Sequence, residues 1–251
     1  MSRFADLSLS VVLPAYNEEQ LIEATIHRAV RSLEQTVGDF EIVLIDDCST
    51  DRTPQLADAL ARTYARVRVI HNPRNLRQGG CLQLGFALAR CDLVMHNAAD
   101  CPFDFDDLSR VLEPFPAADV VVVTRRSYPG VSAGRRFVSW ANRSLIRVLF
   151  GLRITDYNFV QVYRRTVLTE LECFSTATAF MTVERIVRAH HRGYRVEAID
   201  ADYHRRETGV SSSGNLRVIR DSVRDMARLW AELRLSRAGR ASSGRCQGDV
   251  L

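Results

Sequence analysis

The stretch EIVLIDDCSTDRT, residues 41–53, carries the first clear indication of the fold. Its apolar, β-branched beginning predicts a buried strand. Asp46 and Asp47 close that strand, and residues 49–51 supply the side chains that commonly cap a helix, which we expect to run through Leu60. A strand that passes directly into a helix is the first part of a βαβ unit, so this stretch predicts an α/β domain.

The same alternation extends over the first half of the chain. Apolar runs predict further strands at residues 9–13, 67–70, 93–95 and 119–123, and amphipathic patterns predict helices from Asn17 and over residues 79–89. Strands and helices that alternate in this way form parallel sheets, which bind ligands at the carboxyl ends of their strands. Polar clusters follow four of these strands, so we expect one site built from residues 14–18, 46–51, 72–80 and 96–100.

Composition restricts the chemistry that is open to the chain. All 34 basic residues are arginine, so a phosphate site must use guanidinium or backbone N–H groups rather than lysine. The six cysteines form no C-x-x-C pair and have no zinc-like spacing with histidine, which predicts reduced thiols and no zinc site. The first residues do not resemble a signal peptide. No run reaches the ~18 apolar residues that span a bilayer, which predicts a soluble or peripheral protein.

The second half of the chain is more basic. Residues 125–155 contain seven arginines and no acid. Within them, residues 137–150 predict an amphipathic helix that carries Arg143 and Arg147 on one face, together with Arg136 before it. Trp140 on this helix belongs either in the core or at an interface.

The remaining patterns predict elements that alternate up to a long C-terminal helix. We expect strands at 158–163 and 195–199, a helix over 182–191 and a long helix over 215–235. The serine-, glycine- and arginine-rich tail predicts disorder. The expected organisation is one domain over 1–214, with one half at 8–124 and a second half at 125–214, followed by the amphipathic helix 215–235 and the tail 236–251.

Several ordered motifs resemble a known family. VVLPAYNEE (11–19), IVLIDDCSTDRT (42–53) and NPRNLRQGGCLQLGFALARCDLVM (72–95) are similar to family 2 glycosyltransferases of the GT-A fold. RITDYNFVQVYRRTVL (153–168) and HRRETGVSS (204–212) extend the resemblance to the dolichol- or polyprenyl-phosphate mannose synthase branch. The resemblance implies a Rossmann-like, mostly parallel sheet flanked by helices, with a C-terminal helical extension.

The resemblance assigns the donor site to the strand ends. In the family, the turn after the first strand lines the nucleoside, and the first acid after the second strand accepts a hydrogen bond from the base. The alternative for Asp46 and Asp47 is that they only cap the next helix. The glycine-rich helix start at residues 75–80 either contacts phosphate or forms only a turn. In the family, an R-x-x-G-x-S loop, here residues 206–211, folds over the diphosphate. The expected nucleotide-sugar-binding residues are Pro14, Ala15, Tyr16, Glu18, Asp46, Asp47, Gly79, Asn97, Ala98, Ala99, Asp100, Arg206 and Ser211.

The segment HNAAD, residues 96–100, departs from the family pattern. Relatives place two acids one residue apart here, which hold Mg²⁺ or Mn²⁺ against the diphosphate. Alignment of Asp100 with the second acid leaves Ala98 in place of the first. Because Mg²⁺ often combines one or two carboxylates with phosphate and water ligands, we expect a one-carboxylate metal site at Asp100 with relaxed metal dependence. Asp104 most simply caps the helix that begins near Leu108.

The resemblance makes residues 8–124 the nucleotide-sugar half and residues 125–214 the acceptor half, and the acceptor itself is expected on the basic segment 125–155. The resemblance places an arginine-bearing amphipathic segment near the membrane, where Arg135, Arg136 and Asn142 would bind the acceptor; a solvated helix face is the alternative. Glu184 aligns with the acid of the acceptor side, and would be a base for a hydroxyl acceptor or would order an arginine for a phosphate acceptor. The imidazole of His96 could also act as a base, but the simpler expectation is that His96 is a structural histidine. The expected catalytic residues are Asp100, Glu184 and Arg206.

The sequence therefore predicts an inverting glycosyltransferase. It would move a hexose from a nucleotide-diphosphate sugar, of the GDP-mannose or UDP-glucose type, to a polyprenyl phosphate. Two alternatives are transfer to a soluble hydroxyl acceptor and a degenerate GT-A domain that binds nucleotide sugars without catalysis. The expected partners are the donor, polyprenyl phosphate or another small acceptor, and Mg²⁺ or Mn²⁺, with no nucleic acid. The expected location is the cytoplasm, with peripheral contact at the inner face of the membrane.

Overall fold

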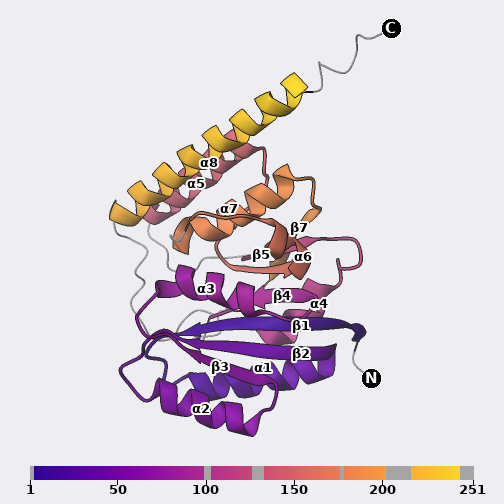
Figure 1. Cartoon of the computed structure of the whole chain (residues 1–251), viewed down its shortest axis with the longest axis vertical. Helices are drawn as coiled ribbons and strands as arrows, with labels where there is room; N and C mark the ends of the chain where they lie inside the picture. Colours follow the sequence, from indigo (N-terminus) through magenta and orange to yellow (C-terminus); the bar gives the residue numbers. More distant parts are fainter. Residues whose placement is uncertain (1–2, 99–102, 126–132, 176–177, 202–215, 244–251) are drawn as a thin grey trace.

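The chain forms one seven-stranded sheet with helices on both faces (Figure 1). The computed structural model describes residues 3–98, 103–125, 133–175, 178–201 and 216–243. The strand order is β3-β2-β1-β4-β6-β5-β7, so β1 lies between β2 and β4. The strands are β1 (Phe4–Ala15), β2 (Val37–Asp46), β3 (Val67–His71), β4 (Leu93–His96), β5 (Val120–Arg125), β6 (Val160–Arg164) and β7 (Val196–Ala201).

Eight α-helices and one short 3₁₀ helix in the described ranges connect these strands. They are α1 (Ile22–Thr36), α2 (Thr53–Thr63), α3 (Arg77–Leu88), the 3₁₀ helix η1 (Phe105–Asp107), α4 (Leu108–Leu112), α5 (Ala133–Phe150), α6 (Arg165–Glu170), α7 (Thr178–His191) and α8 (Leu216–Ser243). None of them is both long and apolar enough to cross a bilayer.

The predicted mostly parallel sheet is confirmed, and β6 is the exception. β6 runs antiparallel to both β4 and β5, whereas the other pairings in the described ranges are parallel. After α5, residues 151–159 return the chain to the carboxyl edge of the sheet, where β6 then starts. This reversal places the loop before β6, rather than the loop after it, at the edge where the candidate site lies.

Alternate residues of the central strands enter two separate cores. Leu9, Val11 and Leu13 of β1 pack in one core with α1, α2 and α4, whereas Val12 packs in the other with α3 and α7. Because both faces of β1 are covered, Val11, Val12 and Leu13 are apolar without alternation, and Ser10 before them is buried as well. A Cβ atom on Gly85 would lie 2.2 Å from the Cγ1 atom of Val12, so only glycine allows α3 to approach β1 this closely.

Helix α8 covers the outer side of α7. Its Met226 and Leu229 side chains are buried in the same core as α7. The helix continues past Ser236, where the sequence pattern predicts the start of a disordered tail, as far as Ser243. Arginine and alanine in this stretch have high helix propensity, which favours continuation of the helix over the effect of its serines and glycine.

Candidate functional site

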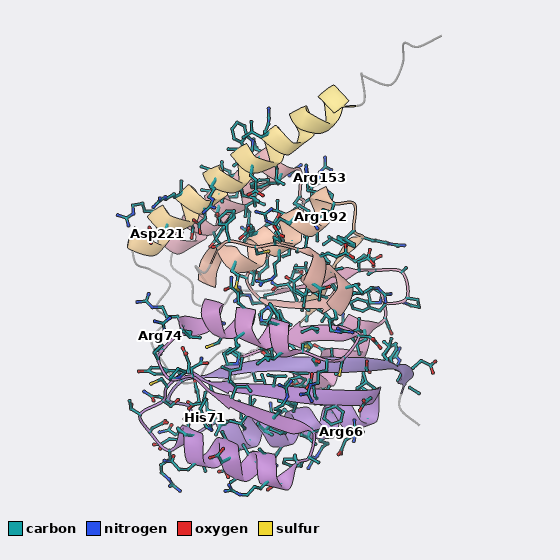
Figure 2. All side chains as sticks on the ribbon, in the orientation of Figure 1. Arg66, His71, Arg74, Arg153, Arg192 and Asp221 are labelled. Carbon is teal, nitrogen blue, oxygen red and sulfur yellow. The ribbon has the colours of Figure 1, made fainter. Side chains whose placement is uncertain are left out.

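Four polar clusters meet at the carboxyl edge of the sheet. In the strand register, Ala15 of β1 lies beside Asp46 of β2, and Asp46 lies beside His71 of β3. On the other side of β1, Val12 lies beside His96 of β4. The segments that follow these four strands are therefore neighbours, as the sequence predicts. Figure 2 shows His71 at this edge and Arg66 at the opposite end of β3.

Asp47 fastens the start of α3 to the end of β2. Its carboxylate is buried, and its Oδ1 atom accepts hydrogen bonds from Asn72 Nδ2 at 2.9 Å and from the Leu76 backbone N–H at 2.7 Å. Its backbone carbonyl accepts a further bond from Asn75 Nδ2 at 3.2 Å. The observed contacts of Asp47 are therefore with the turn after β3 and the start of α3.

Asp46 has an intramolecular partner on each carboxylate oxygen. Oδ1 accepts from the Ser49 backbone N–H at 3.1 Å, and Oδ2 lies 2.9 Å from His71 Nδ1. A carboxylate oxygen has two lone pairs, so Asp46 keeps the capacity to accept a further N–H. Helix α2 has its own cap, because Asp51 Oδ1 accepts from the Thr53 N–H at 2.9 Å. Asp46 and Asp47 are therefore not needed to cap α2.

His71 bridges two acids. Its Nδ1 atom faces Asp46, and its Nε2 atom lies 3.1 Å from Asp58 Oδ1 on α2. The hydrogen bond to Asp46, together with Asp58, raises the pKa of His71 above its ordinary value, although burial opposes this shift. No sequence motif indicates this histidine, because its partners are distant along the chain.

The turn after β1 is joined to the turn after β2. Asn17 has a φ of 54°, a left-handed conformation that asparagine tolerates better than most residues. Its Oδ1 atom accepts from the Thr50 backbone N–H at 2.8 Å, and its own N–H donates to Ser49 Oγ at 3.0 Å. Tyr16 beside it is 49% exposed, so its ring is available at the edge. Of the other predicted nucleoside-contacting residues, Pro14 and Glu18 are half-buried and Ala15 is buried.

The glycine-rich helix start also lies at this edge. Helix α3 begins at Arg77, two residues before the predicted start at Gly79, and Gly79 is buried. Leu76, which precedes the helix, is held by Asp47. The first N–H groups of a helix favour anions, so this end of α3 is suited to a phosphate group.

The HNAAD segment begins with two buried side chains that are engaged inside the protein. His96 Nε2 lies 2.5 Å from Gln161 Oε1 of β6, and burial, with a contribution from the charge of Arg185, lowers the pKa of His96 to about 4. A neutral, hydrogen-bonded histidine is a structural residue at neutral pH. Asn97 is buried as well, and its Nδ2 donates to the Phe103 carbonyl at 3.2 Å.

The residues that would complete this segment are only partly described. Ala98 is half-buried, whereas Ala99 and Asp100 lie outside the described residues, as do Arg206 and Ser211. Asp104 is a capping residue, as predicted, but it caps η1 by accepting from the Asp106 N–H at 3.1 Å, whereas α4 at Leu108 begins directly after η1 and has no side-chain cap. In the part of the chain that the structure describes, no three metal-binding side chains gather.

Glu184 is completely buried in the acceptor half. Its Oε1 atom accepts from Arg188 Nε at 2.7 Å and from the Phe174 N–H at 3.2 Å, and its Oε2 atom accepts from the Ser175 N–H at 2.9 Å. A base for a hydroxyl acceptor needs an oxygen in reach of that acceptor. The observed geometry instead favours the alternative in which Glu184 orders an arginine.

The loop before β6 adds residues that the sequence patterns do not indicate as site residues. Asp156 is buried and forms an ion pair with Arg125 at the end of β5, with an Nε–Oδ2 distance of 2.6 Å. The Arg125 guanidinium also lies 5.1 Å from the ring centroid of Phe159. This pair lies where β5 ends and β6 begins.

The basic helix α5 adjoins the same loop. Arg143 Nη1 donates to the Thr155 carbonyl at 3.1 Å, and Asn142 is half-buried. Arg135 and Arg136 lie in the first turn of α5, and their side chains are not described. The structure therefore places the three predicted acceptor residues on one helix without defining their contacts to a ligand.

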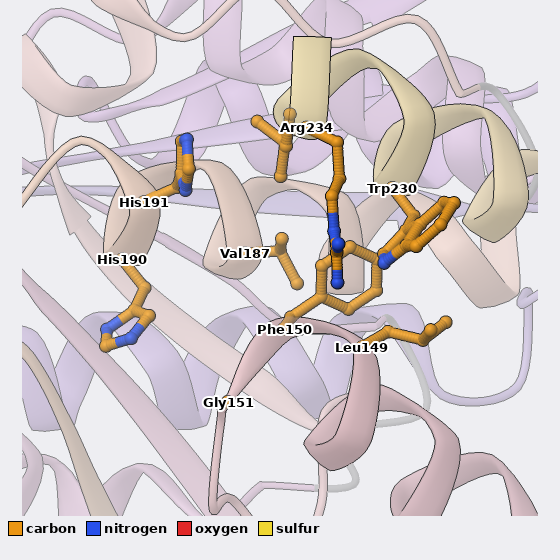
Figure 3. A pocket seen from close by; sticks show the side chains of 9 residues that line it. Leu149, Phe150, Gly151, Val187, His190, His191, Trp230 and Arg234 are labelled. Atoms are coloured by element: carbon orange, nitrogen blue, oxygen red, sulfur yellow. The ribbon is translucent and has the colours of Figure 1, made fainter. Parts of the chain in front are cut away.

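A separate pocket of about 380 Å³ lies between α5, α7 and α8 (Figure 3). The Arg234 guanidinium lies 4.7 Å from the Trp230 ring centroid on its α8 side, and His190 and His191 line its α7 side. None of the predicted site residues lines this pocket, so it is distinct from the strand-end site.

Comparison with known proteins identifies the family. The model of Glycosyl transferase family 2 matches residues 10–200. The chain belongs to glycosyl transferase family 2. This confirms the resemblance that the strand-end motifs indicate, and the match covers the second half of β1, all of β2 to β6 and most of β7.

Curated members of the family are similar along most of the chain. Glycosyltransferase AglD of Haloferax volcanii is 29% identical over 91% of this chain and 37% of its own length. An undecaprenyl-phosphate 4-deoxy-4-formamido-L-arabinose transferase of Pseudomonas fluorescens is 28% identical, and the similarity covers 84% of this chain and 61% of that protein. An undecaprenyl-phosphate mannosyltransferase of Micrococcus luteus is 28% identical, and the similarity covers 80% of this chain and 85% of that protein. The chain thus spans less than two thirds of the first two relatives.

A solved structure supports the fold. Glucosyl-3-phosphoglycerate synthase from Mycobacterium tuberculosis, in complex with Mg²⁺ and uridine diphosphate, superimposes with a TM-score of 0.67. The similarity covers 90% of this chain and 80% of that protein at 19% sequence identity. The family 2 match and this superposition confirm the predicted GT-A fold.

The His71 bridge predicts a pH-dependent contribution to stability. The raised pKa means that protonated His71 stabilises the folded state fully below its unfolded pKa of about 6.5. This contribution is lost as the pH rises through the higher folded pKa. The urea midpoint of the wild type should therefore exceed that of His71→Gln most at low pH, and the difference should shrink towards pH 8.5. Replacement of exposed His190 by Gln is the control. A difference in urea midpoint between the wild type and His71→Gln that stays constant with pH would contradict the bridge.

Proposed function

We propose that this family 2 glycosyltransferase transfers a hexose from a nucleotide-diphosphate sugar to a polyprenyl phosphate with inversion. The observation that carries the proposal is the convergence of four strand-end clusters beside a basic helix. The strand ends are suited to a nucleotide diphosphate, and the basic helix is suited to an anionic acceptor. The names of similar proteins, which act on undecaprenyl phosphate, support the acceptor class.

The donor would lie across the ends of β1, β2 and β3. Tyr16 offers an exposed ring for the nucleoside, and Asp46 offers carboxylate lone pairs for a base N–H. The first turn of α3 would face the diphosphate with its N–H groups. Arg206 and Ser211 would close over the diphosphate, where a guanidinium stabilises the charge that develops on the leaving group.

A phosphate acceptor fits the observed state of the acidic residues. A phosphate oxygen is already anionic near neutral pH, so it needs no base to activate it. The candidate bases near the edge are not poised for this task, because His96 is neutral and held by Gln161 and Glu184 is bound to Arg188. Arg135, Arg136 and Asn142 on α5 would bind the acceptor phosphate.

A divalent cation fits the donor set only as a weakly held ion. Ala98 offers no side-chain oxygen, and the amide of Asn97 is used within its own loop, where Nδ2 donates to Phe103. Asp100 would therefore be the protein carboxylate that holds Mg²⁺ or Mn²⁺, with diphosphate oxygens and water as the other ligands. The ion would neutralise charge on the leaving diphosphate.

The acceptor assay is the direct test of the proposal. GDP-mannose and UDP-glucose are each supplied with a short polyprenyl phosphate or with small hydroxyl acceptors, in Mg²⁺ or Mn²⁺. We expect the purified protein to transfer sugar to the polyprenyl phosphate. Transfer only to hydroxyl acceptors would replace the lipid acceptor by a soluble one. Tight binding of nucleotide without turnover for any pair would identify a non-catalytic binding domain.

The HNAAD segment predicts opposite effects for two substitutions. Asp100→Ala should reduce kcat/KM at least about a hundredfold, because it removes electrostatic stabilisation of the departing diphosphate. Ala98→Asp adds a second carboxylate and should lower the Mn²⁺ concentration needed for half-maximal activity. Steady-state kinetics with a metal titration measures both effects. Normal transfer by Asp100→Ala, with a wild-type unfolding temperature, would show that Asp100 holds no essential metal.

Helix α5 also presents a surface suited to a membrane. Trp140 is 58% exposed, and Val148 is 80% exposed. Trp140 is thus outside the core, which favours its alternative role at an interface. Arg147 is also exposed on this helix. Exposed apolar side chains beside arginine are typical of helices that lie on anionic bilayers, so we place this helix against the inner face of the membrane.

Vesicle binding tests this membrane contact. Val148→Asp should weaken sedimentation with phosphatidylglycerol vesicles about tenfold, the size expected for the loss of one buried apolar side chain. Arg62→Gln on α2 changes the net charge by the same amount on the other side of the sheet and should leave binding unchanged. Equal binding by the wild type and Val148→Asp would place the membrane contact elsewhere.

A further inference from the structure

One face of α8 contacts the acceptor half through three charged side chains. Asp225, Arg228 and Glu232 are spaced by three and four residues, so they lie on the same side of the helix. The Arg228 guanidinium lies 4.1 Å from the ring centroid of Phe174, and the other two side chains form hydrogen bonds to the acceptor half. This face is therefore built to hold the segment before α7.

Arg188 connects this face of α8 to the buried acid Glu184. Its Nε atom donates to Glu184, while Nη1 and Nη2 donate to the two carboxylate oxygens of Glu232, each at 2.8 Å. Burial opposes the charge on Arg188, but its hydrogen bonds to Glu232 and Glu184 raise its pKa above the ordinary value. The hydrogen bonds from Arg188 lower the pKa of Glu232. Arg188 and Glu232 therefore stabilise each other in the charged form, and the same guanidinium links Glu232 to Glu184.

Ser175 is the point at which three helices meet. Its carbonyl accepts from Gln83 Nε2 of α3 at 3.0 Å, and its N–H donates to Glu184 of α7 at 2.9 Å. Its hydroxyl donates to Asp225 of α8 at 2.7 Å. Ser175 is almost completely buried, so these contacts hold it from three directions. Helix α8 thus reaches the junction between the nucleotide-sugar half and the acceptor half.

We propose that Glu232 and Asp225 are positioning residues for acceptor binding, because they hold Glu184 and the 174–175 segment through Arg188 and Ser175. This inference rests on the proposed function. The described polar contacts of α8 with the rest of the domain are to Phe174, Ser175 and Arg188, so we expect donor binding not to depend on it. Helix α8 is then a working part of the acceptor site rather than an extension attached to a complete domain.

The proposed positioning role depends on the energetic cost of leaving the buried Arg188 guanidinium without its acidic partners. When Glu232 no longer accepts the fork of Arg188, the buried guanidinium keeps Glu184 as its acidic partner and leaves donors unsatisfied. The guanidinium must then shift towards water or recruit another acceptor, and either movement disturbs the oxygens that hold the N–H groups of Phe174 and Ser175. The effect should be local to this segment, because α8 also packs through Met226 and Leu229.

The experiment uses the full chain with Glu232→Gln, Ser175→Ala and a matched control. Gln keeps the shape of Glu232 and loses its charge, and Ala removes the Ser175 hydroxyl while keeping both backbone bonds. Asp221→Asn is the control, because this acid on the same helix pairs with neighbouring Arg220. Hydrogen exchange of the 171–175 segment is measured first, and then KM for polyprenyl phosphate and Kd for the nucleotide.

We expect exchange of the Phe174 and Ser175 amides to be at least tenfold faster in Glu232→Gln, with a smaller increase in Ser175→Ala. KM for the acceptor should rise about tenfold while the nucleotide Kd stays within twofold, and Asp221→Asn should behave as the wild type. Unchanged exchange in both variants would overturn the positioning role, as would an unchanged acceptor KM. A parallel loss of nucleotide binding would indicate a general structural role and would also overturn the proposal. Lack of wild-type transfer would reject the proposed function, and the exchange result would still decide whether α8 holds the segment.

Discussion

The hydrogen bonds of the buried Asp47 carboxylate determine where the other parts of the strand-end site lie. A carboxylate inside a protein is stable only when it is well supplied with donors, and here the donors are Asn72 and the backbone of Leu76. Both donors belong to the connection from β3 to α3, so the start of α3 cannot move away from the end of β2. Gly85 then lets the same helix pack closely on β1. Helix α3 is therefore fixed at its start against the ends of β2 and β3, and at Gly85 against β1.

The two halves of the domain are held by different kinds of contact. At the ends of β1, β2 and β3, short side chains and backbone N–H groups make most of the hydrogen bonds, and Asn17, Ser49 and Thr50 are examples. In the acceptor half, arginine forks span longer gaps, as in the Arg125–Asp156 and Arg188–Glu232 pairs. Short contacts favour a rigid site for a ligand of constant shape. Long guanidinium side chains suit the anionic acceptor and the membrane surface that we propose for this region.

The strands, the helices and the shared edge follow from local patterns in the sequence. Runs such as residues 9–13 and 41–45 predict strands because four of the five residues in each are apolar, as burial on both faces favours. The direction of β6 is not predictable in this way, since a short apolar strand has the same pattern in either direction. The His71 bridge and the Arg188–Glu232 pair are also hidden, because their partners are far apart in sequence. Only the Glu184–Arg188 spacing of four residues offers a local indication.

Because β6 runs in the opposite direction, the loop at the candidate site is a different loop from the one that connects β6 to the next helix. For a parallel strand, the residues that reach the site follow the strand, and a change in their loop also affects the connection to the next helix. For β6, the contributing residues precede the strand, in a loop that ends at Phe159 and leaves the β6 connection to α6 untouched. Insertions or substitutions in this loop can therefore change the edge of the sheet where the candidate site lies without disturbing the order of the strands. The same sheet can in this way carry different edges through changes in a single loop.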